Sequence, residues 1–395
     1  MKINLKKYLL YSSLFAIFTE AFFFNFIIDW KLLYLIILTN YILMVRIKTI
    51  KFNIYFLLLN VFFFVHGALA YTIIGIPYNF MLSQIIGIMI VGTYYYNFVP
   101  LYTKEELIEV YSKMCVYVSV LGYALYLVNY NTLDYRLMSI FKEPAHYVVV
   151  VIPACYYFLK TKQWRNFAII FGTLLISNSS LGYIGCGLMF VVPNLTLRRM
   201  GYLAGLIPVV CVVFYFVYQE VPMFRMRFDD TYNSLNVINT GKFEEKTNLS
   251  SYVMIGNMYI AKQNIIDHPL GSGIGSHHYM HTEVYSKQMR APKYLVAQNL
   301  KTSNSFDANS LFTRICSEFG IIGFLFVLFA LYKASDCFSS DDLFMAQGIF
   351  VYFLMKLFRD GHYFPPELFF FIWFFYHSMR NSFIAKPEVK PEINP

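Results

Sequence analysis

Charged side chains are scarce in this chain of 395 residues, because Asp, Glu, Lys and Arg together make up only 14% of it. A soluble domain carries about a quarter charged residues, so the composition excludes a soluble enzyme, a disordered chain and a coiled coil. Segments that alternate apolar and polar residues over about ten positions are also lacking, which excludes an outer-membrane barrel.

Cysteine is equally sparse. The six cysteines all lie in or beside apolar segments, and the one long polar segment, residues 219–308, contains none. This distribution argues against a disulfide framework. No small-residue cleavage site follows the first apolar run, so we expect a retained membrane helix there and not a signal peptide.

Apolar residues are abundant: 58% of the chain is hydrophobic and 20% aromatic. They fall into blocks of about twenty residues, the length that crosses a bilayer core of about 30 Å. We therefore predict an all-α polytopic membrane protein with about twelve transmembrane helices and one large extracytoplasmic loop containing short helices. The expected spans cover residues 8–28, 31–45, 52–74, 79–99, 107–129, 144–160, 165–178, 181–195, 200–218, 309–332, 342–358 and 363–380.

The basic residues of the short loops predict the orientation. With the N-terminus in the cytoplasm, sixteen Lys and Arg residues fall in inner loops, and four fall in outer ones: Lys31, Arg136, Lys142 and Arg359. Both termini are then cytoplasmic. The net charge of +9 is attributed largely to this bias, and nucleic acid is not expected as a partner.

The chain divides into four predicted parts. Residues 1–218 form an N-terminal transmembrane bundle of about nine spans, and residues 219–308 form the large extracytoplasmic loop. Residues 309–385 return as C-terminal transmembrane helices, and residues 386–395 form a cytoplasmic tail that we expect to be disordered. Within the loop, the apolar spacing of YVMIGNMYIAKQNII predicts a helix that ends at His268-Pro269.

Four short motifs fall on the predicted outer side. Asn309-Ser310 is followed by nine residues and then by Gly320 and Gly323. The remaining three are a glycine turn (PLGSGIG, residues 269–275), a Phe-x-Glu-Pro segment (residues 141–144) and FRDGHYFP (residues 358–365). In their order and common side, these motifs resemble those of the O-antigen ligase and polymerase superfamily. The resemblance covers most of the chain in architecture.

The resemblance implies a metal-independent membrane glycosyltransferase of the bacterial cytoplasmic (inner) membrane. It would polymerise polyprenyl-pyrophosphate-linked oligosaccharide repeat units into O-antigen or capsular polysaccharide on the outer face. Such units would be both donor and acceptor in the lipid bilayer, and no cofactor is expected. A chain-length regulator and a flippase are the protein partners that such a pathway suggests.

One residue departs from the pattern of the ligases. Asn309 stands where they have histidine, and an amide cannot act as a general base, which favours a polymerase over an O-antigen ligase. An alternative of another class is a lipid-linked oligosaccharide transporter or flippase. Several such folds consist of two similar halves, which this sequence does not show.

The implied chemistry needs cations near the departing pyrophosphate and a base near the acceptor hydroxyl. The candidate catalytic residues are Glu143, His278 and Asp360. The candidate substrate-binding residues lie on or near the predicted outer side: Arg136, Arg225, Arg227, Asn309, Arg314 and Arg359.

Several of these residues also have plainer interpretations. Arg314 lies four residues before Glu318 on one predicted helix, so the two side chains can simply pair. Glu143 precedes a proline and can mark a helix start. Lys356 and Arg359 lie near a helix end, where both can extend their charges toward the membrane surface.

Two further groups in the loop have alternatives. Arg225 and Arg227 follow the ninth span and can reach lipid head groups as readily as substrate. His277, His278 and His281 suggest a metal site, but no cysteine and no well-spaced carboxylate accompanies them, so none is expected.

Overall fold

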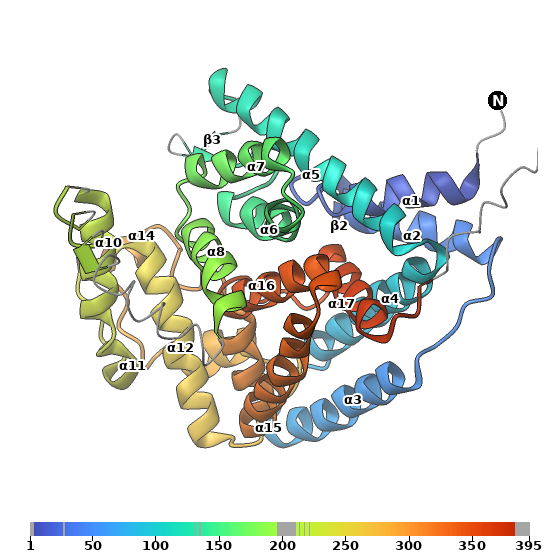
Figure 1. The fold of residues 1–395 in the computed structure, drawn as a ribbon. Coiled ribbons are helices and arrows are strands. Elements are labelled where there is room, and N and C mark those ends of the chain that lie inside the picture. The colour runs from blue at the N-terminus through green and yellow to red at the C-terminus, as the bar shows by residue number, and fades with distance from the viewer. Residues whose placement is uncertain are drawn as a thin grey trace, which may run out of the picture.

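The structure is a computed structural model, and it describes residues 4–26, 28–130, 132–133, 136–195, 211–212, 214–216, 218–220 and 222–383. This part of the chain is mostly helical (Figure 1). Its strands form two short antiparallel pairs: β1 (Phe23–Phe26) with β2 (Ile28–Lys31), and β3 (Thr132–Leu133) with β4 (Arg136–Leu137).

Helices occupy eleven of the twelve predicted apolar blocks. They are α1 (Leu5–Ala16), α2 (Leu32–Val45), α3 (Ile54–Ile74), α4 (Asn79–Phe98), α5 (Lys104–Leu127), α6 (Pro144–Lys160), α7 (Trp164–Ile176), α8 (Ser180–Val191), α15 (Leu311–Ala334), α16 (Phe344–Phe358) and α17 (Pro366–Arg380). Short 3-10 turns follow or join some of them: η1 (Val99–Leu101), η2 (Val192–Asn194), η4 (Ser335–Ser339) and η5 (Asp341–Leu343). Most of block 200–218 and the tail 386–395 lie outside the described residues.

The first block departs from its predicted extent. We expected a helix over residues 8–28, but α1 ends at Ala16 and the chain turns into the β1–β2 hairpin. Thr19 and Glu20 interrupt the apolar run here, and the Thr19 hydroxyl donates a hydrogen bond to the carbonyl of Ala16. The consequence is that Glu20 lies in a turn and not on a helix.

Four of the described helices are long and apolar enough to cross a membrane: Ile54–Ile74, Asn79–Leu101, Lys104–Leu127 and Leu311–Ser339. Large apolar side chains remain exposed on the first of them, such as Leu69 (62%) and Ile73 (81%). Surfaces of this kind suit contact with lipid. These helices indicate a multi-pass membrane protein, and the number of twelve spans stays a prediction.

Contacts between chain segments far apart in sequence agree with the predicted sidedness. Tyr102 donates a hydrogen bond to the carbonyl of Lys6 (2.7 Å), and the Lys104 ammonium donates to the carbonyl of Asp342 (2.8 Å). All four residues belong to helix ends predicted for the inner side. Which set of ends faces the cytoplasm stays a prediction.

The polar segment before α15 forms its own group of helices: α10 (Pro222–Ser234), α11 (Val237–Thr240), α12 (Leu249–Asp267), α13 (His277–Tyr279), η3 (Met280–Val284) and α14 (Lys293–Ala297). The predicted loop helix is confirmed as α12. Asn248 caps it by accepting a hydrogen bond from the N–H of Ser251 (2.9 Å), and it ends before His268. Figure 1 shows α10, α11, α12 and α14 gathered on one side of the molecule, and α12 packs against α15.

Candidate functional site

The glycine turn (residues 269–275) docks onto α15 through backbone hydrogen bonds. The N–H of Gly273 donates to the carbonyl of Glu318 (2.9 Å), and the N–H of Ile321 donates to the carbonyl of Pro269 (2.9 Å). The helix is kinked between these two bonds, where Gly320 has a φ of 55° and a ψ of −137°. Two motifs that lie about fifty residues apart therefore form one joint.

Close backbone approach explains the glycines at this joint. A Cβ on Gly271 would lie 2.3 Å from the carbonyl oxygen of Glu318, and one on Gly320 would lie 2.0 Å from that of Pro269. Both glycines also have positive φ, which disfavours any side chain. Only glycine fits at both positions without displacing the backbone.

The FRDGHYFP motif packs against the start of α15. The N–H of Asp360 donates to the carbonyl of Asn309 (3.1 Å), and a Cβ on Gly361 would lie 1.7 Å from the carbonyl oxygen of Asp307. Asn309 is buried, and its Oδ1 accepts a hydrogen bond from the side chain of Asn304 (3.2 Å). Three of the four motifs thus meet along the N-terminal half of α15.

Arg314 lies at the centre of this junction. Its Nε donates to Glu318 (3.0 Å), and its Nη1 donates to the carbonyl of Gly361 (2.9 Å). Tyr363 donates to the other oxygen of Glu318 (2.8 Å), and its ring centroid lies 4.1 Å from the guanidinium carbon. The side chains of Arg314 and Glu318 are 3% and 0% exposed, so this ion pair is closed to solvent.

His277 extends the same buried group. Its Nδ1 is 2.9 Å from the hydroxyl of Ser317, and its Nε2 is 3.0 Å from Oδ1 of Asn257. Burial lowers the pKa of His277 well below its ordinary value, and nearby Arg314 adds to this effect, so the ring is neutral at pH 7. We call Arg314, Glu318, Tyr363 and His277 the sealed network.

The three histidines of the loop do not share partners. His278 contacts the hydroxyl of Ser305 (2.7 Å) and stacks on Phe306 with 3.6 Å between ring centroids. Burial lowers the pKa of His278, and it lowers that of His281 to about 4. His278 is therefore a neutral, half-buried imidazole on the loop that precedes α15.

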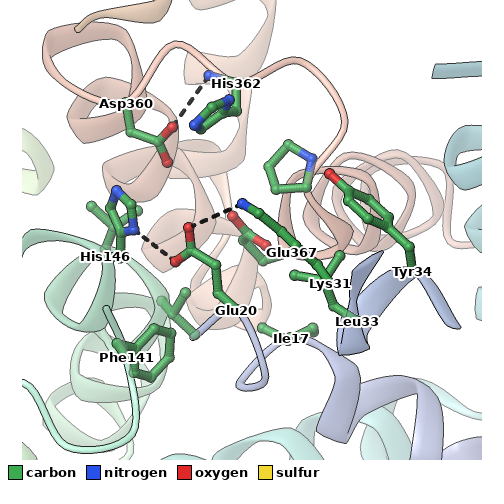
Figure 2. Close-up of a pocket in the computed structure, with 13 residues that line it drawn as sticks. Ile17, Glu20, Lys31, Leu33, Tyr34, Phe141, His146, Asp360, His362 and Glu367 are labelled. Carbon is green, nitrogen blue, oxygen red and sulfur yellow. Dashed lines mark hydrogen bonds and ion pairs between the residues drawn. The ribbon is translucent and has the colours of Figure 1, made fainter. Parts of the chain in front are cut away.

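A second polar group lines a small pocket between α1, β2, α6 and the α16–α17 loop (Figure 2). Glu20 is central to it, with one oxygen 2.6 Å from Nδ1 of His146 and the other 3.8 Å from Nζ of Lys31. Its ionisable lining residues come from segments far apart in sequence: Glu20, Lys31, His146, Asp360, His362 and Glu367. We call this feature the charged pocket.

Lys356 lies behind the charged pocket and contacts two of its lining carboxylates. Its ammonium lies 2.6 Å from Asp360 and 3.9 Å from Glu367, and its side chain is 0% exposed. It therefore does not reach the membrane surface as the sequence allowed. Burial alone would raise the pKa of Asp360, but the charges of Lys356, His362 and His146 together outweigh it and keep that pKa below its ordinary value.

Among the residues that the structure describes, one cluster could offer ligands to a metal ion. Asp307, Asp360 and His362 each bring one ligand atom to within 4.8 Å of the others. The Lys356 ammonium is already bonded to Asp360, and a cation beside it would be repelled. The residues present do not fit a resident metal ion.

Not every predicted site residue lies at these two features. Glu143 is the N-cap residue of α6, three positions before His146, and Arg359 ends α16 beside Asp360. Arg136 lies in β4, and Arg225 is exposed on α10. The side chain of Arg227 lies outside the described part of the structure.

Five of the six ionisable lining residues of the charged pocket were not among the sequence candidates: Glu20, Lys31, His146, His362 and Glu367. Each lies inside or at the edge of a predicted apolar block. Ionisable residues are costly within a membrane and are therefore functional candidates by default. That signal was present in the sequence, but it did not indicate which residues meet.

A family model described as O-Antigen ligase matches residues 165–328. The match includes both glycine motifs and every residue of the sealed network except Tyr363. It supports the O-antigen ligase/polymerase superfamily but does not separate ligases from polymerases. No curated protein matches the chain. Members of the matched family are membrane enzymes that act on lipid-linked saccharides.

Proposed function

We propose that this protein is a glycosyltransferase that polymerises polyprenyl-pyrophosphate-linked repeat units into O-antigen or capsular polysaccharide. The observation that carries the choice of polymerase is Asn309. It occupies the ligase histidine position at the start of α15, where it is buried and where its amide has no basic lone pair to take up a proton. The substrate class follows from the matched family.

The proposed reaction joins two lipid-linked saccharides. A hydroxyl of the incoming unit attacks the anomeric carbon of the growing chain, and the bond from that carbon to the pyrophosphate oxygen breaks. Negative charge develops on the departing pyrophosphate, which positioned cations would stabilise. Arg359 and Arg136 are our candidates for this task, because both lie at helix or strand ends on the predicted outer side.

Deletion of the gene tests the proposed activity. Loss of a polymerase should leave single repeat units where long glycan was made. Loss of a ligase should instead leave long polymer on the carrier lipid. Gel analysis of carrier-linked and finished glycan separates these outcomes, and long carrier-linked polymer in the deletion strain would favour the ligase.

Substitution of Arg359 tests the proposed cation. A positioned group that stabilises transition-state charge contributes about 3 kcal/mol, or roughly 100-fold in rate. Arg359→Ala should therefore nearly abolish polymer at a normal membrane level of the protein. Arg359→Lys keeps the charge but loses the planar fork, so it should also impair the enzyme. Full-length polymer from Arg359→Lys would indicate that Arg359 serves only as a surface charge.

A further inference from the structure

A histidine–carboxylate pair in the charged pocket has no role in the proposal so far. His146 and Glu20 are 126 positions apart in sequence, yet Nδ1 of His146 lies 2.6 Å from Oε2 of Glu20. One residue comes from the first turn of α6, and the other from the turn between α1 and β1. Two independent segments therefore hold this contact in place.

The pair fixes the orientation of the imidazole. A carboxylate only accepts hydrogen bonds, so Nδ1 of His146 must carry the proton that it shares with Glu20. When the ring is neutral, the basic lone pair is then on Nε2. Figure 2 shows this nitrogen on the side of the ring away from Glu20, facing Asp360 across the pocket.

Both members of the pair are partly exposed. The side chains of His146 and Glu20 are 19% and 18% exposed, in contrast to the 3% and 0% of Arg314 and Glu318. Both residues line the charged pocket, whose wall also contains Tyr34 and Phe141. The pair is therefore accessible from the pocket, whereas the ion pair of the sealed network is closed to solvent.

Three carboxylates lie around His146. Glu20 contacts it directly, Asp360 faces it across the pocket, and Glu143 lies three positions before it on α6. The other charged or titratable groups of the lining are Lys31 on β2, Tyr34 on α2, His362 in the α16–α17 loop and Glu367 on α17. Carboxylates next to the ring stabilise the imidazolium that forms when it accepts a proton.

We infer that His146 is the general base of the transfer reaction and that Glu20 is its positioning residue. This inference rests on the proposed function. The acceptor oxygen forms the new bond to the anomeric carbon, and its proton passes to Nε2 of His146. The bond from that carbon to the pyrophosphate breaks, and its electron pair leaves with the pyrophosphate oxygen. The imidazolium then releases the proton to water.

The test uses the full-length protein in lipid vesicles, with carrier-linked repeat units extracted from the deletion strain as substrate. A general base contributes roughly 100- to 10,000-fold in rate, so His146→Ala should lower the rate of chain extension at least 100-fold. Added imidazole should restore part of the activity. His377→Ala is the matched control, because His377 lies on α17 near its inner end and contacts Ser382.

The dependence of the reaction rate on pH in Glu20→Gln tests whether Glu20 positions a catalytic base or only stabilises the fold. In the wild type, the rate should rise with pH as the imidazole loses its proton. The variant lacks the carboxylate that stabilises the imidazolium, so the rising limb should move to lower pH while the maximum rate falls. Glu109→Gln, at an exposed site on α5, should leave the profile unchanged.

The outcomes are distinct. Wild-type protein that never extends the chain contradicts the proposed function itself. Wild-type extension with His146→Ala equally active at the same protein level overturns the inference alone. The same conclusion follows if His146→Ala is inactive without imidazole rescue and Glu20→Gln leaves the rising limb in place. Rescue together with a shifted limb supports the assignment.

Discussion

The sealed network and the charged pocket are neighbouring polar groups that share chain segments but differ in what their side chains contact. In the sealed network, both oxygens of Glu318 and two nitrogens of Arg314 bond to protein atoms. In the charged pocket, Glu20 and His146 bond to each other but keep part of their surface open. The first arrangement stabilises the joint between the motifs, and the second can meet a substrate.

This difference assigns separate roles to residues that look alike in the sequence. Arg314 and Asp360 both belong to superfamily-like motifs on the predicted outer side. The structure places Arg314 among internal acceptors and Asp360 on the wall of the pocket. Substitutions in the sealed network should therefore change stability first, and those in the charged pocket should change activity first.

The largest loss of stability should follow from Gly320→Ala. The added Cβ would meet the carbonyl oxygen of Pro269 at 2.0 Å, and alanine disfavours the backbone conformation of the kink. We expect a loss of about 5 kcal/mol or more in the free energy of unfolding, which is comparable to the whole stability of a marginally stable protein. Membrane level and thermal unfolding in detergent measure it.

Gly187→Ala is the matched control for this substitution. Gly187 lies in α8, and nothing lies within 4 Å of its Cβ position. Alanine there should leave stability unchanged or raise it by up to about 1 kcal/mol, because alanine favours a helix. Equal behaviour of the two variants would show that the joint does not depend on the close approach at Gly320.

The two ion pairs should differ in how much stability is lost when one partner is replaced, and both losses should be smaller than that of Gly320→Ala. Glu318→Gln leaves Arg314 as a buried charge without its partner, which costs about 3–5 kcal/mol. Lys31→Met removes a partly exposed ion pair, with 3.8 Å between Nζ and the oxygen of Glu20, and should cost less than about 1 kcal/mol. Thermal unfolding of both variants measures the difference.

The double variant Arg314→Met/Glu318→Leu sharpens this comparison. It removes both charges and should be more stable than Glu318→Gln alone, because no unpaired charge remains buried. If the double variant is instead less stable than the single one, the guanidinium contacts to Gly361 and Tyr363 contribute more than the ion pair does.

Local sequence signals predicted much of the fold. The apolar block 144–160 coincides with α6 from end to end, because Glu143-Pro144 marks its start. The (i, i+4) spacing of Arg314 and Glu318 correctly indicated a pair, which has a length of 3.0 Å. Such features depend on residues within about one helical turn, so the sequence contains them directly.

The charged pocket depends on contacts that local patterns do not contain. Glu20 meets His146 only because α1 ends at Ala16, which puts Glu20 in a turn beside the start of α6. The apolar count over residues 8–28 predicted one continuous helix and so concealed this turn. Likewise, the spacing of Lys356 and Arg359 did not indicate that the Lys356 ammonium would be buried and paired with Asp360.

The smallest effect concerns pH and the sealed network. His277 is held neutral by burial, with a pKa well below its ordinary value, whereas in the unfolded chain it binds a proton below about pH 6.5. The unfolded state then binds more protons, so stability falls as pH falls. As the pH falls toward 5, proton uptake by His277 in the unfolded chain lowers the free energy of unfolding, and His281, whose pKa burial lowers to about 4, adds to this loss. His277→Gln should therefore flatten the decline in melting temperature between pH 7.5 and about pH 5 without abolishing it, whereas Gly187→Ala should leave that slope unchanged. An equally steep decline in His277→Gln would mean that the network opens to water before the protein unfolds, and the distinction between a closed network and a partly exposed pocket would fail.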